Sequence, residues 1–346
     1  MKISYPLMGS YDVPTKYLLR KLIKDTDIVY PPKITSKTKE LGAKNSPDFV
    51  CTPFKYTLGT MIEALDKGAD TIIQFGGGCR YGYYHELQRE ILENLGYKFK
   101  LINFISGGKT INVSKLLKEY KINRLKFVYY FLVTAKMVTY MDKIADYIRL
   151  NSCYEIEKGS FNKLRQRILD DFLTVKGFID LKRKYHYYKK EIKKVKLKKK
   201  DVIKVGLIGE LYTLMEPVAN YNIEQELISM GCSVKRFTNA SYLIFRKKKA
   251  VRRYLKNFFI KYRMGADALD NIHHTKYLCE HDYDGIIHIK SSFCTPEISA
   301  MPIISKVAKE YDVPVIFFSM DLNTSETGIK TRLEAFYDML EMRKKK

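Results

Sequence analysis

The first hundred residues alternate between short apolar runs and stretches whose apolar residues recur with the period of a helix. Leu18, Leu19 and Leu22, for example, share one face of a predicted helix. Short apolar runs bounded by turn residues predict strands, whereas a period near 3.6 predicts helices. The polar stretch 33–48 follows neither period and is predicted as a loop. The predicted strands are 2–8, 27–32, 70–75 and 98–104, and the predicted helices are 13–24, 54–69 and 83–97.

The strand pattern stops at about residue 112 and restarts at Val202. Between these points two long stretches keep a helical period, with Tyr and Phe on the apolar face, and a lysine-rich linker at 191–200 closes the segment. The aromatic residues of this segment are interpreted as core packing. After the restart, the predicted strands are 203–211, 233–238, 283–290 and 313–321, and the predicted helices are 221–232, 252–265, 295–312 and 327–342.

Strands that alternate with helices of this length indicate parallel sheets. The fold class is therefore predicted to be α/β, with two flavodoxin-like or Rossmann-like parallel-sheet domains and a helical segment between them. The expected boundaries are 1–111 for the first α/β domain, 112–200 for the helical segment with its basic linker, and 201–346 for the second α/β domain. Ligands of such sheets bind beyond the carboxyl ends of the strands.

Composition excludes several classes of protein. The apolar fraction of 46% in 346 residues indicates a folded globular chain. No stretch approaches the length of a membrane span, and the N-terminus lacks a secretory pattern, so we expect a cytoplasmic protein without a membrane partner. The net charge of +24 is concentrated in lysine runs that read as solvated helix faces or linkers, without a nucleic-acid-binding motif. We therefore expect no nucleic-acid partner, and rather an acidic partner or a nucleotide-bearing substrate.

Three of the six cysteines share one predicted setting. Cys51, Cys79 and Cys294 each follow an apolar run or strand and precede a predicted helix, and two of them occur in the same tripeptide Cys-Thr-Pro. Proline suits the first turn of a helix, where its missing N–H costs nothing. A cysteine at a helix N-terminus has a lowered pKa, which favours the thiolate and therefore metal ligation.

Three glycines precede Cys79. Because Gly76, Gly77 and Gly78 carry no side chains, backbone N–H groups can approach there and donate to the sulfur atoms of a cluster. The remaining cysteines lack such a setting and are interpreted as small core residues or surface thiols. They are Cys153, Cys232 and Cys279.

Three thiolates suit two kinds of metal centre. One is zinc with three protein ligands and a water. The other is a 4Fe–4S cluster with one iron left open. Because the ligands come from distant loops, their spacing does not choose between the two, and the residues alone also allow plain core cysteines.

Four acidic residues follow predicted strands at the same sheet edges and are weak catalytic candidates. Helix capping explains them as well as catalysis does. The segment Gly-Leu-Ile-Gly-Glu-Leu is not a dinucleotide-binding motif and no phosphate-binding loop is present, so ATP binding by this chain is not predicted. The four candidates are Glu210, Glu216, Asp321 and Glu326.

The segments 50–84, 206–224 and 318–336 resemble the 2-hydroxyacyl-CoA dehydratase superfamily. The resemblance is closest to its activase-associated branch, labelled CoA-protein activase or 2-hydroxyglutaryl-CoA dehydratase-like. It covers both predicted α/β domains and is weakest in the helical middle. The resemblance implies one 4Fe–4S cluster on three cysteines, which match Cys51, Cys79 and Cys294; the extra cysteines of the double-cubane subgroup are missing here.

The resemblance also implies partners and a reaction. In the family, an ATP-hydrolysing iron–sulfur activase transfers a low-potential electron to the cluster-bearing component, which removes an unreactive hydroxyl group by radical chemistry. The expected function is thus a dehydratase-like component that acts at an open iron on an acyl-CoA-like substrate, with a related subunit or a second copy as partner. The alternative is an electron-relay partner of a large activase-like protein that binds no substrate.

Overall fold

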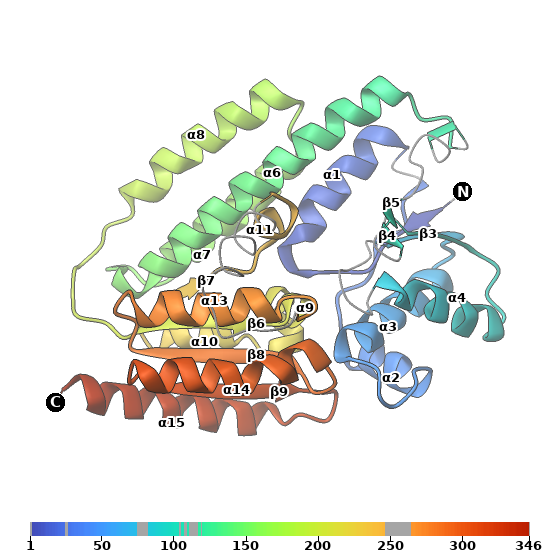
Figure 1. Cartoon of the computed structure of the whole chain (residues 1–346). Coiled ribbons are helices and arrows are strands. Elements are labelled where there is room, and N and C mark those ends of the chain that lie inside the picture. The colour runs from blue at the N-terminus through green and yellow to red at the C-terminus, as the bar shows by residue number, and fades with distance from the viewer. Residues whose placement is uncertain are drawn as a thin grey trace. The chain divides into compact units, whose positions relative to one another are not determined.

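The computed structural model describes residues 2–24, 27–74, 82–103, 105–106, 109–110, 117–118, 120–245 and 264–345 (Figure 1). The chain divides into two compact units, Met1–Lys136 and Met137–Lys346. Most of the helix predicted at 252–265 lies outside the described residues.

The first unit contains a parallel sheet of three strands. They are β1 (Ile3–Ser4), β2 (Thr71–Gln74) and β3 (Lys100–Asn103), in the order β1-β2-β3. The strands predicted at 70–75 and 98–104 are confirmed, and the one at 2–8 is shorter than predicted. The strand predicted at 27–32 is wrong, because among the described residues it contributes only a bridge from Ile28 to Ile3, and the two prolines that end it lack the N–H groups to extend the ladder.

Helices surround this sheet, and most of them were predicted. They are α1 (Asp12–Leu22), α2 (Ser36–Lys44), α3 (Thr52–Asp66) and α4 (Tyr84–Asn94). A short antiparallel pair, β4 (Ile105–Ser106) and β5 (Lys109–Thr110), follows β3 and was not predicted.

The loop predicted at 33–48 is wrong, because Ser36–Lys44 form helix α2. Its start is fixed locally by a capping box, in which the Thr35 backbone N–H donates to Thr38 Oγ1 at 3.0 Å. The sequence did not predict this helix, because only a narrow face of it is buried and an apolar period is therefore missing.

The backbones of α2 and α3 touch through two glycines. A Cβ on Gly42 would lie 2.0 Å from the carbonyl oxygen of Lys55, and one on Gly59 would lie 2.0 Å from that of Thr38. Between the helices, buried Thr38 Oγ1 donates to Glu63 Oε2 at 2.5 Å. Helix α3 is therefore buried by α2 as well as by the sheet.

The segment after the first sheet is helical, as predicted. Tyr140 and Tyr185 stack with ring centroids 3.7 Å apart, and Phe161 and Phe172 are fully buried, so the core-packing interpretation holds for these residues. Other aromatic residues of the segment are exposed: Tyr129, Phe131, Phe178 and Tyr187. The helices are α6 (Arg124–Asn151), α7 (Ser160–Leu173) and α8 (Phe178–Lys194).

The second unit contains a parallel sheet of four strands in the order β7-β6-β8-β9. The strands are β6 (Lys204–Gly209), β7 (Ser233–Arg236), β8 (Gly285–Ser291) and β9 (Val315–Met320). The helices are α9 (Leu211–Met215), α10 (Ile223–Ser229), α11 (Ala240–Phe245), α13 (Ala268–Cys279), α14 (Thr295–Glu310) and α15 (Glu326–Lys344). Two parallel sheets with covering helices confirm the predicted α/β fold class.

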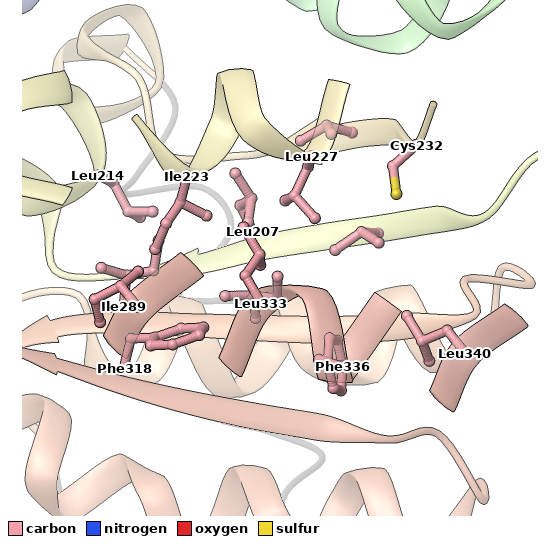
Figure 2. Close-up of a cluster of buried hydrophobic side chains, with 14 of the residues drawn as sticks. Leu207, Leu214, Ile223, Leu227, Cys232, Ile289, Phe318, Leu333, Phe336 and Leu340 are labelled. Atoms are coloured by element: carbon pink, nitrogen blue, oxygen red, sulfur yellow. The ribbon is translucent and has the colours of Figure 1, made fainter. Parts of the chain in front are cut away.

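Both faces of this sheet are buried by helices. Helices α10 and α15 cover one face, where Leu227, Leu333 and Phe336 pack against strand residues such as Leu207 and Ile289. Figure 2 shows this cluster gathered between α10, the strands and α15. Helices α13 and α14 supply the apolar residues of the opposite face. Burial on both faces is consistent with the mostly apolar sequences of β6 and β9.

The strand order defines a switch point between β6 and β8. The chain leaves β6 to build β7 on one side and later returns to place β8 on the other. In doubly wound sheets, ligands bind outside the carboxyl ends of the strands at such a point.

Candidate functional site

The carboxyl ends of β6 and β8 lie backbone to backbone at this switch point. Gly209 ends β6 with φ of +139°, and a Cβ there would lie 1.8 Å from the carbonyl oxygen of Ile289. The next N–H along the chain, that of Glu210, donates to the same oxygen at 2.9 Å. Only glycine combines this φ with this close approach.

Cys294 lies just beyond the end of β8. A two-residue turn follows the strand, and Cys294 is the N-cap of α14, with Pro296 in the first helical turn. Its side chain is half-buried. The predicted strand-to-helix position is confirmed for this cysteine, and its thiol lies at the positive end of a 16-residue helix.

Cys51 occupies the same position at the start of another helix. It is the half-buried N-cap of α3, and Pro53 lies in the first turn. The expectation that a strand or apolar run precedes it is wrong, because α2 and a turn precede it and Phe49 is 82% exposed. What the two Cys-Thr-Pro segments share is thus the helix start and not the element before it.

Cys79 and its three glycines lie outside the described residues. Strand β2 ends at Gln74 and α4 begins at Tyr84. The cofactor-binding role predicted for Gly76, Gly77 and Gly78 stays a prediction.

The other three cysteines have a different environment. Burial raises the pKa of the Cys153 thiol, that of Cys232 to about 12 and that of Cys279 to about 11. Because the thiolate is the metal ligand, burial disfavours metal ligation by these three thiols. Within the described residues, no group of three or more His, Cys, Asp or Glu side chains is arranged to hold a metal.

A buried polar network holds the start of α14. His288 and Lys290 alternate with isoleucines along β8 and belong to the face that α13 and α14 cover. His288 Nε2 and Glu297 Oε2 lie 2.7 Å apart, and Asn271 Nδ2 donates to the same carboxylate oxygen at 2.9 Å. Asn271 also bonds the backbone N–H and carbonyl of Gly209. The first turn of α14 is therefore tied to β8, α13 and β6.

Lys290 is a buried lysine at the end of β8, with 4% of its surface exposed. Its Nζ donates to the carbonyl oxygens of Ser291 and Ser292 at 3.4 and 3.3 Å, both long contacts. Burial lowers its pKa, while the negative charges of Cys294 and Glu297 act in the opposite direction. A lysine ammonium thus faces the loop that carries Cys294.

Glu210 and Glu216 act as helix caps. Glu210 accepts from the backbone N–H groups of Tyr212 and Thr213 at 2.9 Å each, at the start of α9. Glu216 accepts from Val218 N–H at 3.1 Å and caps a short 3-10 helix. Burial raises the pKa of Glu210 to about 7. The capping interpretation holds for both residues, and a catalytic role stays a prediction.

Asp321 and Glu326 lie beyond β9. Asp321 accepts from Asn323 N–H at 2.8 Å and from Ser292 Oγ at 3.4 Å, which links this loop to the one after β8. Glu326 is exposed and pairs with Lys330 Nζ at 3.2 Å. Of the four acidic candidates, Asp321 is therefore connected to the Cys294 loop and Glu326 faces solvent.

The residues that the sequence analysis missed are His288, Lys290, Glu297 and Asn271. The sequence did contain a signal for them. His288 and Lys290 lie two positions apart in an otherwise apolar strand, so they share one face of that strand, which is buried. Such a face needs polar partners, and Glu297 in the following first helical turn was the nearest one in sequence.

We expect Glu210→Gln to flatten the pH dependence of stability. From 4.5 to about 7, the folded protein binds a proton at Glu210 that the unfolded chain releases, so the free energy of unfolding falls as pH rises through this window. This difference in proton binding changes the free energy of unfolding by about 3 kcal/mol across the window, and the variant should lack that change. Urea unfolding between pH 4.5 and pH 8 measures it; parallel curves for the two proteins would contradict the assignment.

Comparison with known families gives one match. Residues 232–340 match the family described as 2-hydroxyglutaryl-CoA dehydratase, D-component. The match runs from β7 to α15 and includes Lys290 and Cys294. It confirms the predicted resemblance to the 2-hydroxyacyl-CoA dehydratase superfamily and indicates a dehydratase-like component. No curated protein matches the chain significantly. None of the helices within the described residues is both long and apolar enough to cross a membrane.

Proposed function

We propose that the protein is a cytoplasmic iron–sulfur component of the 2-hydroxyacyl-CoA dehydratase type. Cys51, Cys79 and Cys294 bind one 4Fe–4S cluster. An ATP-dependent activase supplies low-potential electrons, and an acyl-CoA-like compound is the substrate. A related subunit or a second copy of the chain completes the assembly. The family match supports the class of protein, and the ligands, electron donor and substrate are the proposal.

One observation carries the proposal. Two cysteines from different units occupy the same N-cap position before Thr-Pro, and the second lies inside the family match. Both are half-buried, whereas Cys153 and Cys232, which lack this motif, are buried. The described donors therefore fit a cluster ligated by thiolates.

When bound, the cluster supplies one-electron reduction at low potential and an iron position open to an oxygen ligand. The chain's own residues prepare its sites. The positive ends of α3 and α14 stabilise the thiolates of Cys51 and Cys294. Glu297, through His288 and Asn271, fixes the first turn of α14 against the sheet.

The protein purified without oxygen is expected to carry about four irons and as many sulfides per chain. Iron and acid-labile sulfide analysis of protein from iron-replete cells measures this. Stoichiometric zinc in place of iron would refute the proposal.

A ligand test separates the catalytic role from electron relay. Binding of an acyl-CoA at an open iron should change the electron paramagnetic resonance spectrum of the reduced protein. Oxidation in air should also convert the cluster to a three-iron form, because that iron has no cysteine ligand. A spectrum that no acyl-CoA alters would remove the catalytic role and leave the electron-relay function.

A further inference from the structure

Lys290 places a positive charge in a buried position at the end of β8. A buried ammonium must be compensated by partners, and a methionine would fill the same space without that cost. Its two contacts, to the carbonyl oxygens of Ser291 and Ser292, are 3.4 and 3.3 Å long. Among the described residues, no carboxylate forms an ion pair with it. These long contacts compensate the ammonium only weakly, so a negative charge beside it would be stabilising.

The surroundings of Lys290 indicate where that anion lies. Cys294 and Glu297 are the two acidic groups whose charges act on the ammonium. Both hydrogen bonds of Glu297, to His288 and Asn271, use Oε2, and its buried Oε1 has no hydrogen-bond partner among the described residues. Cys294 lies at the end of the turn whose carbonyl oxygens hold Lys290 Nζ. Negative charge that forms at Cys294 would therefore add to that of Glu297 in stabilising the ammonium.

We propose that Lys290 is a positioning residue for the iron–sulfur site, whose ammonium balances negative charge at Cys294 and favours the reduced cluster. This inference rests on the proposed function. Adding one electron to a cluster ligated by thiolates adds one negative charge, and the potential of such clusters depends on net charge and hydrogen bonds to sulfur. A charge held in a buried position changes the reduction potential far more strongly than a charge in water does.

The test is a redox titration of the full-length, cluster-loaded protein. A titanium(III) chelate donates one electron per cluster, and electron paramagnetic resonance follows the reduced form. Lys290→Met keeps an unbranched side chain, shorter by the terminal nitrogen, and removes its charge. We expect the equilibrium constant for reduction to fall at least tenfold, which corresponds to a potential about 59 mV more negative for one electron.

Two variants serve as controls. Lys290→Arg keeps the charge, and its equilibrium constant for reduction should stay within about threefold of the wild-type value. Lys330→Met removes a lysine that is 43% exposed and pairs with Glu326 on the surface of α15, and it should leave the potential unchanged because solvent screens its charge.

The outcomes distinguish the two proposals. A wild-type protein that binds no iron overturns the proposed function and this inference with it. A loaded Lys290→Met protein with the wild-type potential overturns the inference alone. The melting temperature of the cluster-free proteins tests a purely structural role. We expect Lys290→Met to melt no lower than the wild type, and a clear decrease would show that Lys290 serves the packing of the unit instead.

Discussion

Replacing Cys51, Cys79 or Cys294 by alanine is expected to abolish the visible absorbance of the anaerobically purified protein. Each substitution removes one of three thiolate ligands, and a cluster already lacking a fourth cysteine has no ligand to replace it. Absorbance spectra with iron analysis of the three variants measure the effect. The expected loss is nearly complete for each variant.

The same substitution at the other cysteines is the matched control. Cys153→Ala, Cys232→Ala and Cys279→Ala remove thiols that burial keeps protonated, so the cluster should remain and stability should fall by about 1 kcal/mol. Loss of the cluster in Cys279→Ala together with its retention in Cys294→Ala would contradict the ligand assignment.

Gly209→Ala is expected to be the most destabilising single substitution in the second unit that we propose to test. The added Cβ would lie 1.8 Å from the Ile289 carbonyl oxygen, and the φ of +139° is strained for any other residue. The neighbouring atoms are backbone of β8, which cannot move without disturbing the sheet. We expect a loss of more than about 3 kcal/mol in the free energy of unfolding, measured in urea.

Gly159→Ala separates the effect of backbone strain from that of the contact with β8. Gly159 also has a positive φ, of +86°, but a Cβ there would meet nothing within 4 Å. Its cost should be about 1 kcal/mol, from backbone strain alone. Equal losses for the two variants would show that the contact with β8 is not the cause.

The strands of the second sheet were predictable because both of their faces are buried. Sequences such as β6 and β9 are then continuous apolar runs that stand out from amphipathic helices. Helix α14 was equally clear, since Thr295 and Pro296 mark its first turn and an apolar period follows.

Helix α2 could not be predicted because its support is tertiary. The contact that stabilises it is between the backbones at Gly42 and Gly59, and glycine carries no helical signal in a sequence pattern. The error also misplaced Cys51, which was expected to follow a strand or apolar run and instead follows a helix and a turn.

The buried polar network was missed for a different reason. A sequence shows that His288 and Lys290 share one side of a strand, but not which helix covers that side. Asn271 comes from α13, distant in sequence, and its bonds to Gly209 depend on the strand order β6-β8. Partners brought together by sheet topology cannot be read from local spacing.

Helix ends usually fray, but the first turn of α14 has no freedom to do so. Glu297 connects it to the middle of β8, and Asn271 carries that connection to α13 and to the end of β6. Local opening of this turn would break buried hydrogen bonds to β8 and to α13 at once. A group bound at Cys294 is therefore expected to have a support that resists local opening, so that fraying of the helix does not set the rate of its release.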